Sequence, residues 1–161
     1  MRDNIFYGTL LAKYVKEVLQ VRRTLLTLAV AVALLFSMCA LAYAGSGSGY
    51  WLGGTYYYTD TDGLSYQAYY MNGTLYTSYN NGLSSTSRYM GDKLYTNYSN
   101  GLAATTYTML DTTYTNWNNG LSAKTYQIGD RMYTNYSDGT NLSTYWIGDR
   151  LYTNWNKGFD W

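Results

Sequence analysis

The sequence predicts an all-β protein made of tandem β-hairpins. Its tyrosines recur every nineteen residues without an insertion, at Tyr57, Tyr76, Tyr95, Tyr114, Tyr133 and Tyr152. Each repeat unit contains an Asn-Gly or Asp-Gly dipeptide, which favours the tight turn of a hairpin. Between the turns lie segments of strand length that are rich in Thr and Tyr, and the chain has no proline. A fixed period of this kind is the signature of a repeat architecture.

The first 44 residues differ from the rest and predict a signal peptide. Arg22 and Arg23 precede an apolar run at 25–36, and Ala42 and Ala44 supply small residues at a cleavage site. The alternative is an uncleaved membrane anchor, because residues 25–44 are about long enough to span a bilayer. Residues 1–20 are unusually long for the front of a signal peptide, so we expect a non-native extension before a true start at Val21.

The exported part is expected to begin with residues 45–49, Gly-Ser-Gly-Ser-Gly, as a flexible tether. The tandem β-repeat domain then occupies 50–161. The array begins and ends within a unit, because "YWLGG" at 50–54 matches the end of the unit "YWIGD" at 145–149.

Composition limits the function of the exported part. It has six basic residues against eight aspartates and no glutamate, so its net charge is near −2. No basic cluster is present, which argues against nucleic acid as a partner and against a membrane after signal cleavage. Histidine is absent and the only cysteine, Cys39, precedes the cleavage site. General acid–base catalysis, thiol nucleophiles and thiolate metal sites therefore lack their usual residues, and we expect no enzyme and no cofactor.

Two turns divide each unit into two strands, giving about twelve strands in all. The first turn is Asn-Gly or Asp-Gly, as at Asn100-Gly101, and the second is usually Gly-Asp, as at Gly91-Asp92. Strands joined by such turns form an antiparallel meander in one sheet, which is too wide to stay flat and should twist, coil or curl into a partial barrel. The alternative is a β-solenoid, in which each unit is one rung and like residues stack.

The odd repeat length constrains the loops of a meander. With two residues in both loops, equivalent side chains of successive units would point to opposite faces of the sheet. One extra residue per unit restores the match, and we place it in the second turn, as Gly91-Asp92-Lys93 and Gly129-Asp130-Arg131. One face then carries Leu94, Thr96, Tyr98, Thr105, Tyr107 and Met109, and this face is expected to be buried. The other carries Tyr95, Asn97, Ser99, Leu102, Ala104 and Thr106.

The aspartates of the second turn recur at one position, as Asp92, Asp111, Asp130 and Asp149. A row of carboxylates is one way to hold calcium, but aspartate in a turn usually serves local backbone hydrogen bonding. We favour the structural role and expect no metal site.

A stripe of aromatic and amide side chains is the candidate binding surface. It consists of Tyr95, Asn97, Tyr114, Asn116, Tyr133, Asn135, Tyr152 and Asn154. Aromatic rings offer apolar faces to sugar rings, and the amides beside them can bind hydroxyl groups. The alternative is that cross-strand tyrosine contacts and asparagine ladders only hold the sheet together.

The unit "GDKLYTNYSNGLAATTY" at 91–107 resembles the aromatic hairpin repeats of choline-binding-type cell-wall-binding modules, and it is also similar to the MORN and YD repeat classes. Tyr95 and Tyr107 stand where the choline-binding pattern has tryptophans, and the period is one residue shorter. The resemblance implies a surface-attached, non-catalytic repeat module.

These observations predict an exported, non-catalytic protein in the periplasm, at the cell surface or outside the cell. It would bind a repetitive ligand, such as a glycan or cell-wall polymer, through many equivalent weak contacts. The alternative is a structural protein that self-associates into a fibre or amyloid-like surface layer through open strand edges.

Overall fold

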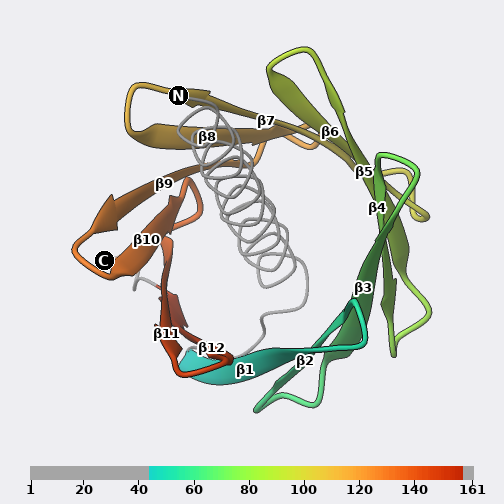
Figure 1. The fold of residues 1–161 in the computed structure, drawn as a ribbon. Coiled ribbons are helices and arrows are strands. Elements are labelled where there is room, and N and C mark those ends of the chain that lie inside the picture. Colours follow the sequence, from blue (N-terminus) through green and yellow to red (C-terminus); the bar gives the residue numbers. More distant parts are fainter. Residues whose placement is uncertain (1–43, 158–161) are drawn as a thin grey trace, which may run out of the picture. The chain divides into compact units, whose positions relative to one another are not determined.

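The computed structural model describes residues 44–157, which form a closed barrel of twelve antiparallel strands (Figure 1). They belong to one compact unit, Ala40–Trp161. The strands are β1 (Ala44–Leu52), β2 (Thr55–Asp60), β3 (Ser65–Met71), β4 (Thr74–Tyr79), β5 (Ser84–Met90), β6 (Lys93–Tyr98), β7 (Ala103–Met109), β8 (Thr112–Trp117), β9 (Ser122–Ile128), β10 (Arg131–Tyr136), β11 (Thr140–Ile147) and β12 (Arg150–Lys157). This part of the chain has no helix long and apolar enough to cross a membrane.

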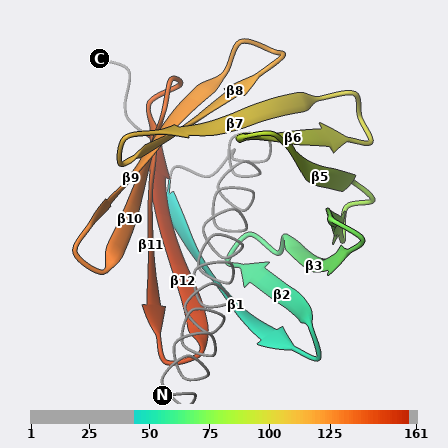
Figure 2. The same cartoon turned by 45° about the horizontal axis from the view of Figure 1, so that its top comes forward.

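The antiparallel meander is confirmed, whereas the open curved sheet and the solenoid are wrong. Each strand pairs with its neighbours in sequence, and β1 also pairs with β12, from Ala44 opposite Asn156 to Tyr50 opposite Arg150 (Figure 2). Strand twist bends a wide sheet until its two edges meet, and their pairing removes the exposed edge groups. Every strand of the described part therefore has a partner on both sides.

Residues 45–49 are not a tether, because they lie within β1, the strand that closes the barrel. Their three glycines face inward at the points where large rings from the neighbouring strands lie. A side chain at Gly45 would overlap the indole of Trp155, and side chains at Gly47 and Gly49 would overlap the phenols of Tyr58 and Tyr56. The described repeat barrel thus begins at residue 44, and the rest of the predicted signal peptide lies outside the described residues.

The extra residue of each unit lies in the Asn-Gly turn. The prediction that it lies in the Gly-Asp turn is therefore wrong. In the repeat at 93–109, Gly101 N–H donates to Tyr98 O (3.1 Å) and Tyr98 N–H donates to Leu102 O (2.9 Å). These two bonds enclose a three-residue loop, 99–101, whose last residue is Gly101 with φ of +86°. This is a type I turn followed by a left-handed residue that forms a bulge.

The second turn has two residues. Met90 pairs with Lys93 across Gly91-Asp92, and Met109 pairs with Thr112 across the equivalent turn. Moving the extra residue changes which face the following strand presents to the interior. The buried residues of the example repeat are therefore Leu94, Thr96, Tyr98, Ala104 and Thr106. The predicted buried positions of β6 are confirmed, while those of β7 are wrong: Thr105, Tyr107 and Met109 face outward.

The inward face combines rings with a belt of small hydroxyl side chains. The hydroxyls meet in cross-strand pairs, Ser87 with Thr96 (2.9 Å), Thr106 with Thr115 (3.0 Å) and Thr125 with Thr134 (2.8 Å). Each pair satisfies two buried polar groups and contributes about 1 kcal/mol. Aromatic rings gather around Tyr66, whose ring centroid lies 5.0 Å from that of Tyr58 and 5.4 Å from that of Tyr79.

Candidate binding surface

All eight residues of the predicted stripe lie on the outer face of the barrel. Tyr95 and Asn97 come from β6, and their equivalents come from β8, β10 and β12. The tyrosines are half-buried and the asparagines are exposed, in alternation with the buried inward residues. The structure therefore brings the tyrosines and amides of each strand together on one outward strip, as the sequence predicts.

Equivalent tyrosines do not lie next to each other. Tyr95 is opposite Thr105 of β7, and that strand separates it from Tyr114. Each candidate tyrosine of β8, β10 and β12 instead stacks on a tyrosine of the preceding strand. The stacked pairs are Tyr107–Tyr114 (centroids 5.5 Å apart), Tyr126–Tyr133 (5.9 Å) and Tyr145–Tyr152 (5.8 Å), and the pairs Tyr50–Tyr57 and Tyr69–Tyr76 repeat the arrangement.

Cations cover several of the remaining ring faces. The guanidinium of Arg131 lies 4.4 Å from the ring centroid of Tyr145, and that of Arg150 lies 5.5 Å from Tyr50. Such contacts contribute about 0.5–1 kcal/mol each at exposed sites. Tyr95 differs from the other candidates because the residue across from it on β5 is Arg88 and not a tyrosine.

The asparagines of the stripe differ from the asparagines of the turns. Turn asparagines support the backbone. The side chain of Asn118 accepts a hydrogen bond from Ala103 N–H (3.1 Å) and donates one to Gly101 O (3.2 Å). Two repeat units earlier, the side chain of Asn80 accepts from Ser65 N–H and donates to Gly63 O. Among the described residues, no side-chain hydrogen bond involves Asn97, Asn116 or Asn154, and Asn135 makes only a long contact of 3.5 Å to the Tyr126 hydroxyl. The stripe amides therefore remain available for hydroxyl groups outside the chain.

Barrel closure changes how these strips are presented. Six hairpins complete one turn of the barrel, so equivalent strips on successive hairpins point about 60° apart. Strips on β8 and β10 are neighbours, whereas those on β6 and β12 point in opposite directions. A straight polymer would contact about two or three neighbouring strips, and not the whole array as on a flat sheet.

The turn aspartates lie apart from one another. Asp92, Asp111, Asp130 and Asp149 occupy four separate two-residue turns, and the described residues contain no group of three or more metal-binding side chains. A different carboxylate is buried: Asp60 ends β2 at the position where later units have Tyr79, Tyr98, Trp117, Tyr136 and Trp155. Its Oδ1 accepts from Asp62 N–H and Leu64 N–H, both at 2.9 Å, and burial raises its pKa.

Sequence reasoning missed an exposed apolar feature at the end of the barrel that carries the two-residue turns. Outward-facing aliphatic residues occupy the last position of every odd-numbered strand. They are Leu52, Met71, Met90, Met109, Ile128 and Ile147, and we call them the aliphatic tier. Their nineteen-residue spacing is visible in the sequence, but which face they occupy depends on the loop that holds the extra residue.

Comparison of the chain with protein-family models, curated proteins and solved structures finds no match. The likeness to cell-wall-binding repeats therefore remains a resemblance carried by the repeat motif alone.

Proposed function

We propose that this is an exported, non-catalytic binding protein that acts at the cell surface and contacts a repetitive glycan through the outward Tyr and Asn strips. One observation carries the proposal: exposed amides not used by the scaffold recur on β6, β8, β10 and β12, each two residues from an outward tyrosine. Amides bind sugar hydroxyls by hydrogen bonds, and the tyrosines supply hydroxyl groups and ring edges beside them.

The binding mode differs from simple stacking of sugars on every ring. Because Tyr114, Tyr133 and Tyr152 each have one face covered by a partner tyrosine, a sugar can reach only the opposite face, the ring edge and the hydroxyl. Tyr95 is the exception, because the residue opposite it on β5 is Arg88 and not a tyrosine. A glycan chain would span neighbouring strips, and its affinity would come from several weak contacts made at once.

Two double variants with the same number and type of substitutions test this mode. Asn97→Ala with Asn154→Ala keeps the neighbouring strips of β8 and β10, whereas Asn116→Ala with Asn135→Ala keeps the opposite strips of β6 and β12. Sedimentation with isolated bacterial cell wall and with chitin measures polymer binding. The first variant should bind at least about ten-fold more tightly, because only its strips can be bridged by one chain.

A short chitin oligosaccharide is the control ligand, and the two variants should bind it equally. Unchanged cell-wall and chitin binding in a variant with all four asparagines replaced would contradict the proposal. Circular dichroism of each variant verifies that the β-structure is intact.

A further inference from the structure

The outer surface changes in character along the barrel axis. At the turn end stands the aliphatic tier, whose side chains are between 48% and 65% exposed. The tyrosine tier lies two residues before the aliphatic tier on each odd-numbered strand, and it consists of Tyr50, Tyr69, Tyr107, Tyr126 and Tyr145, with Arg88 at the equivalent position of β5. Beyond the tyrosine tier, the outward positions of the odd-numbered strands are Ser, Thr, Gln, Lys, Asn and Ala. The order from the end is therefore aliphatic, aromatic and largely polar.

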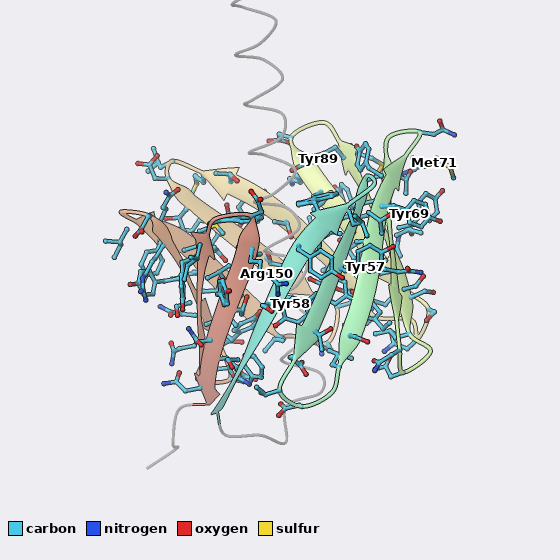
Figure 3. The ribbon with its side chains drawn as sticks, turned by 60° about the horizontal axis from the view of Figure 1, so that its bottom comes forward. Tyr57, Tyr58, Tyr69, Met71, Tyr89 and Arg150 are labelled. Atoms are coloured by element: carbon cyan, nitrogen blue, oxygen red, sulfur yellow. The ribbon has the colours of Figure 1, made fainter. Side chains whose placement is uncertain are left out.

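This apolar end is strongest on two neighbouring hairpins. The turns of β1–β2 and β3–β4 are Gly53-Gly54 and Asn72-Gly73 and carry no charge, whereas each of the other four turns carries an aspartate. The same two hairpins expose aromatic rings at this end: Tyr50 and Tyr69 on the outer face, and Trp51 and Tyr70 at inward-facing positions of the barrel mouth, are all more than one-third exposed. The ring of Trp51 also contacts that of the buried Tyr56, with centroids 5.4 Å apart. In Figure 3, Met71 lies next to the turn of its hairpin and Tyr69 lies below it. We call the turn end of β1–β4 the apolar sector.

We propose that the apolar sector docks on the surface of a lipid bilayer. Leu52 and Met71 would enter the acyl boundary, while Tyr50, Trp51 and Tyr69 would lie at the headgroup level, where amphipathic rings are favoured. Two residues along a strand separate the two tiers by about 5–7 Å, which matches the shallow depth at which peripheral proteins bury their apolar faces. The uncharged turns allow this end to enter without desolvating a carboxylate.

Charge selects the kind of bilayer. The residues after Ala44 include eight aspartates and six basic residues, so no electrostatic attraction to anionic lipid is expected. A zwitterionic phosphatidylcholine surface is therefore the partner to test. A fluid bilayer also adapts to the convex edge of a barrel, whereas a second protein would need a complementary concave surface. The Asn strips of β8 and β10 would remain in water on other hairpins, so docking is compatible with the proposed function but does not depend on it.

Tryptophan fluorescence of the whole chain provides a direct test, since no tryptophan precedes Trp51. Vesicles of brominated phosphatidylcholine quench only tryptophans at the lipid. We expect quenching relative to unbrominated vesicles, and its loss in Trp51→Phe. Trp146→Phe is the matched control, because Trp146 lies at the same end of the barrel on β11, next to a turn with an aspartate; it should retain the quenching.

Aliphatic substitutions locate the contact. Leu52→Ser with Met71→Ser should weaken vesicle-dependent quenching by roughly ten-fold or more, because two buried aliphatic side chains are removed. Ile128→Ser with Ile147→Ser removes two members of the aliphatic tier outside the apolar sector. This double variant should change the vesicle-dependent quenching by less than about three-fold.

Two results would overturn the proposal. The first is a failure of the quenching pattern, seen either as no quenching of the wild-type chain or as equal loss in both double variants. The second is concentration-dependent self-association without lipid that Leu52→Ser with Met71→Ser abolishes, since this would identify a second copy of the chain as the occupant. Sedimentation velocity without vesicles measures that outcome.

Discussion

Gly49 of β1 lies beneath the phenol of Tyr56 on β2, so closely that any side chain at position 49 would overlap that ring. Tyr56 is completely buried. The ring therefore occupies the space that a β1 side chain would need. Because β1 joins β2 to β12, this relationship links the packing of one tyrosine to the closure of the whole barrel.

Gly49→Val should destabilise the barrel by on the order of 3 kcal/mol, because the added side chain forces the Tyr56 ring from its place in a packed interior. Ser48→Val is the matched control: Ser48 alternates with Gly49 and faces outward, where a β-branched side chain suits a strand. Urea unfolding monitored by circular dichroism measures both. Equal destabilisation by the two variants would contradict the inward role of Gly49.

Leu110→Gly should stabilise the protein by about 0.5–1 kcal/mol. Leu110 has φ of +54° at the first turn position, where four of the other two-residue turns have Gly53, Gly91, Gly129 and Gly148. A left-handed conformation costs a residue with a side chain roughly 1–2 kcal/mol, and glycine loses part of this gain through backbone entropy. At 92% exposed, the leucine side chain has little packing to lose.

The reverse substitution, Gly129→Leu, is the matched control and should destabilise by about 1 kcal/mol. Thermal unfolding compares the two variants with the wild type. A lower midpoint for Leu110→Gly would show that Leu110 makes a contribution other than backbone strain.

Alkaline pH should unfold the protein steeply. Burial raises the pKa of Tyr56, Tyr58, Tyr66, Tyr98 and Tyr136 above the ordinary value near 10. These phenols stay protonated in the folded state while the unfolded chain loses protons above about pH 10. The stability contributed by these protonated phenols is therefore fully present below the pKa of the unfolded chain. It falls as pH rises toward the higher pKa values of the folded state, and the free energy of unfolding drops by up to about 1.4 kcal/mol per pH unit for each phenol.

Tyr66→Phe tests this linkage at one residue. Its buried hydroxyl has no hydrogen-bond partner among the described residues, so removal should cost little at pH 7. Above pH 10 the variant should lose stability less steeply than the wild type. Urea unfolding at several pH values measures the slope, and an unchanged slope would contradict the burial of this phenol.

Asp60→Asn should stabilise the protein at neutral pH. Burial raises the pKa of the Asp60 carboxyl, so its contribution is most favourable below the unfolded value near 4 and is lost as pH rises through the folded value. An asparagine oxygen can still accept from the N–H groups of Asp62 and Leu64.

The stability difference between this variant and the wild type should therefore appear as pH rises from 3 to 7. Denaturant unfolding over this range measures it. A variant that is less stable than the wild type at pH 7 would show that the carboxylate charge is favourable where it lies.

The sequence predicted the candidate strips better than the loops. Tyr95 and Asn97 share the outer face because side chains two apart on a strand always do. The position of the extra residue was wrong because Asn-Gly suits both a two-residue turn and a three-residue loop that ends in left-handed glycine. Local sequence does not separate these cases, and the choice is made by which β7 residues fit the interior. Tyr107 was accordingly assigned to the wrong face.

The amino-acid sequence by itself determined the repeat and the spacing of its tyrosines and amides, and its turn dipeptides favoured an antiparallel order of strands over a solenoid. Only the tertiary structure decided that Gly45–Gly49 is a strand, that β1 meets β12, and that aliphatic residues form an outward tier. Those features depend on contacts between the two ends of the array, such as Gly45 opposite Trp155, which lie more than one hundred residues apart and which no local pattern encodes.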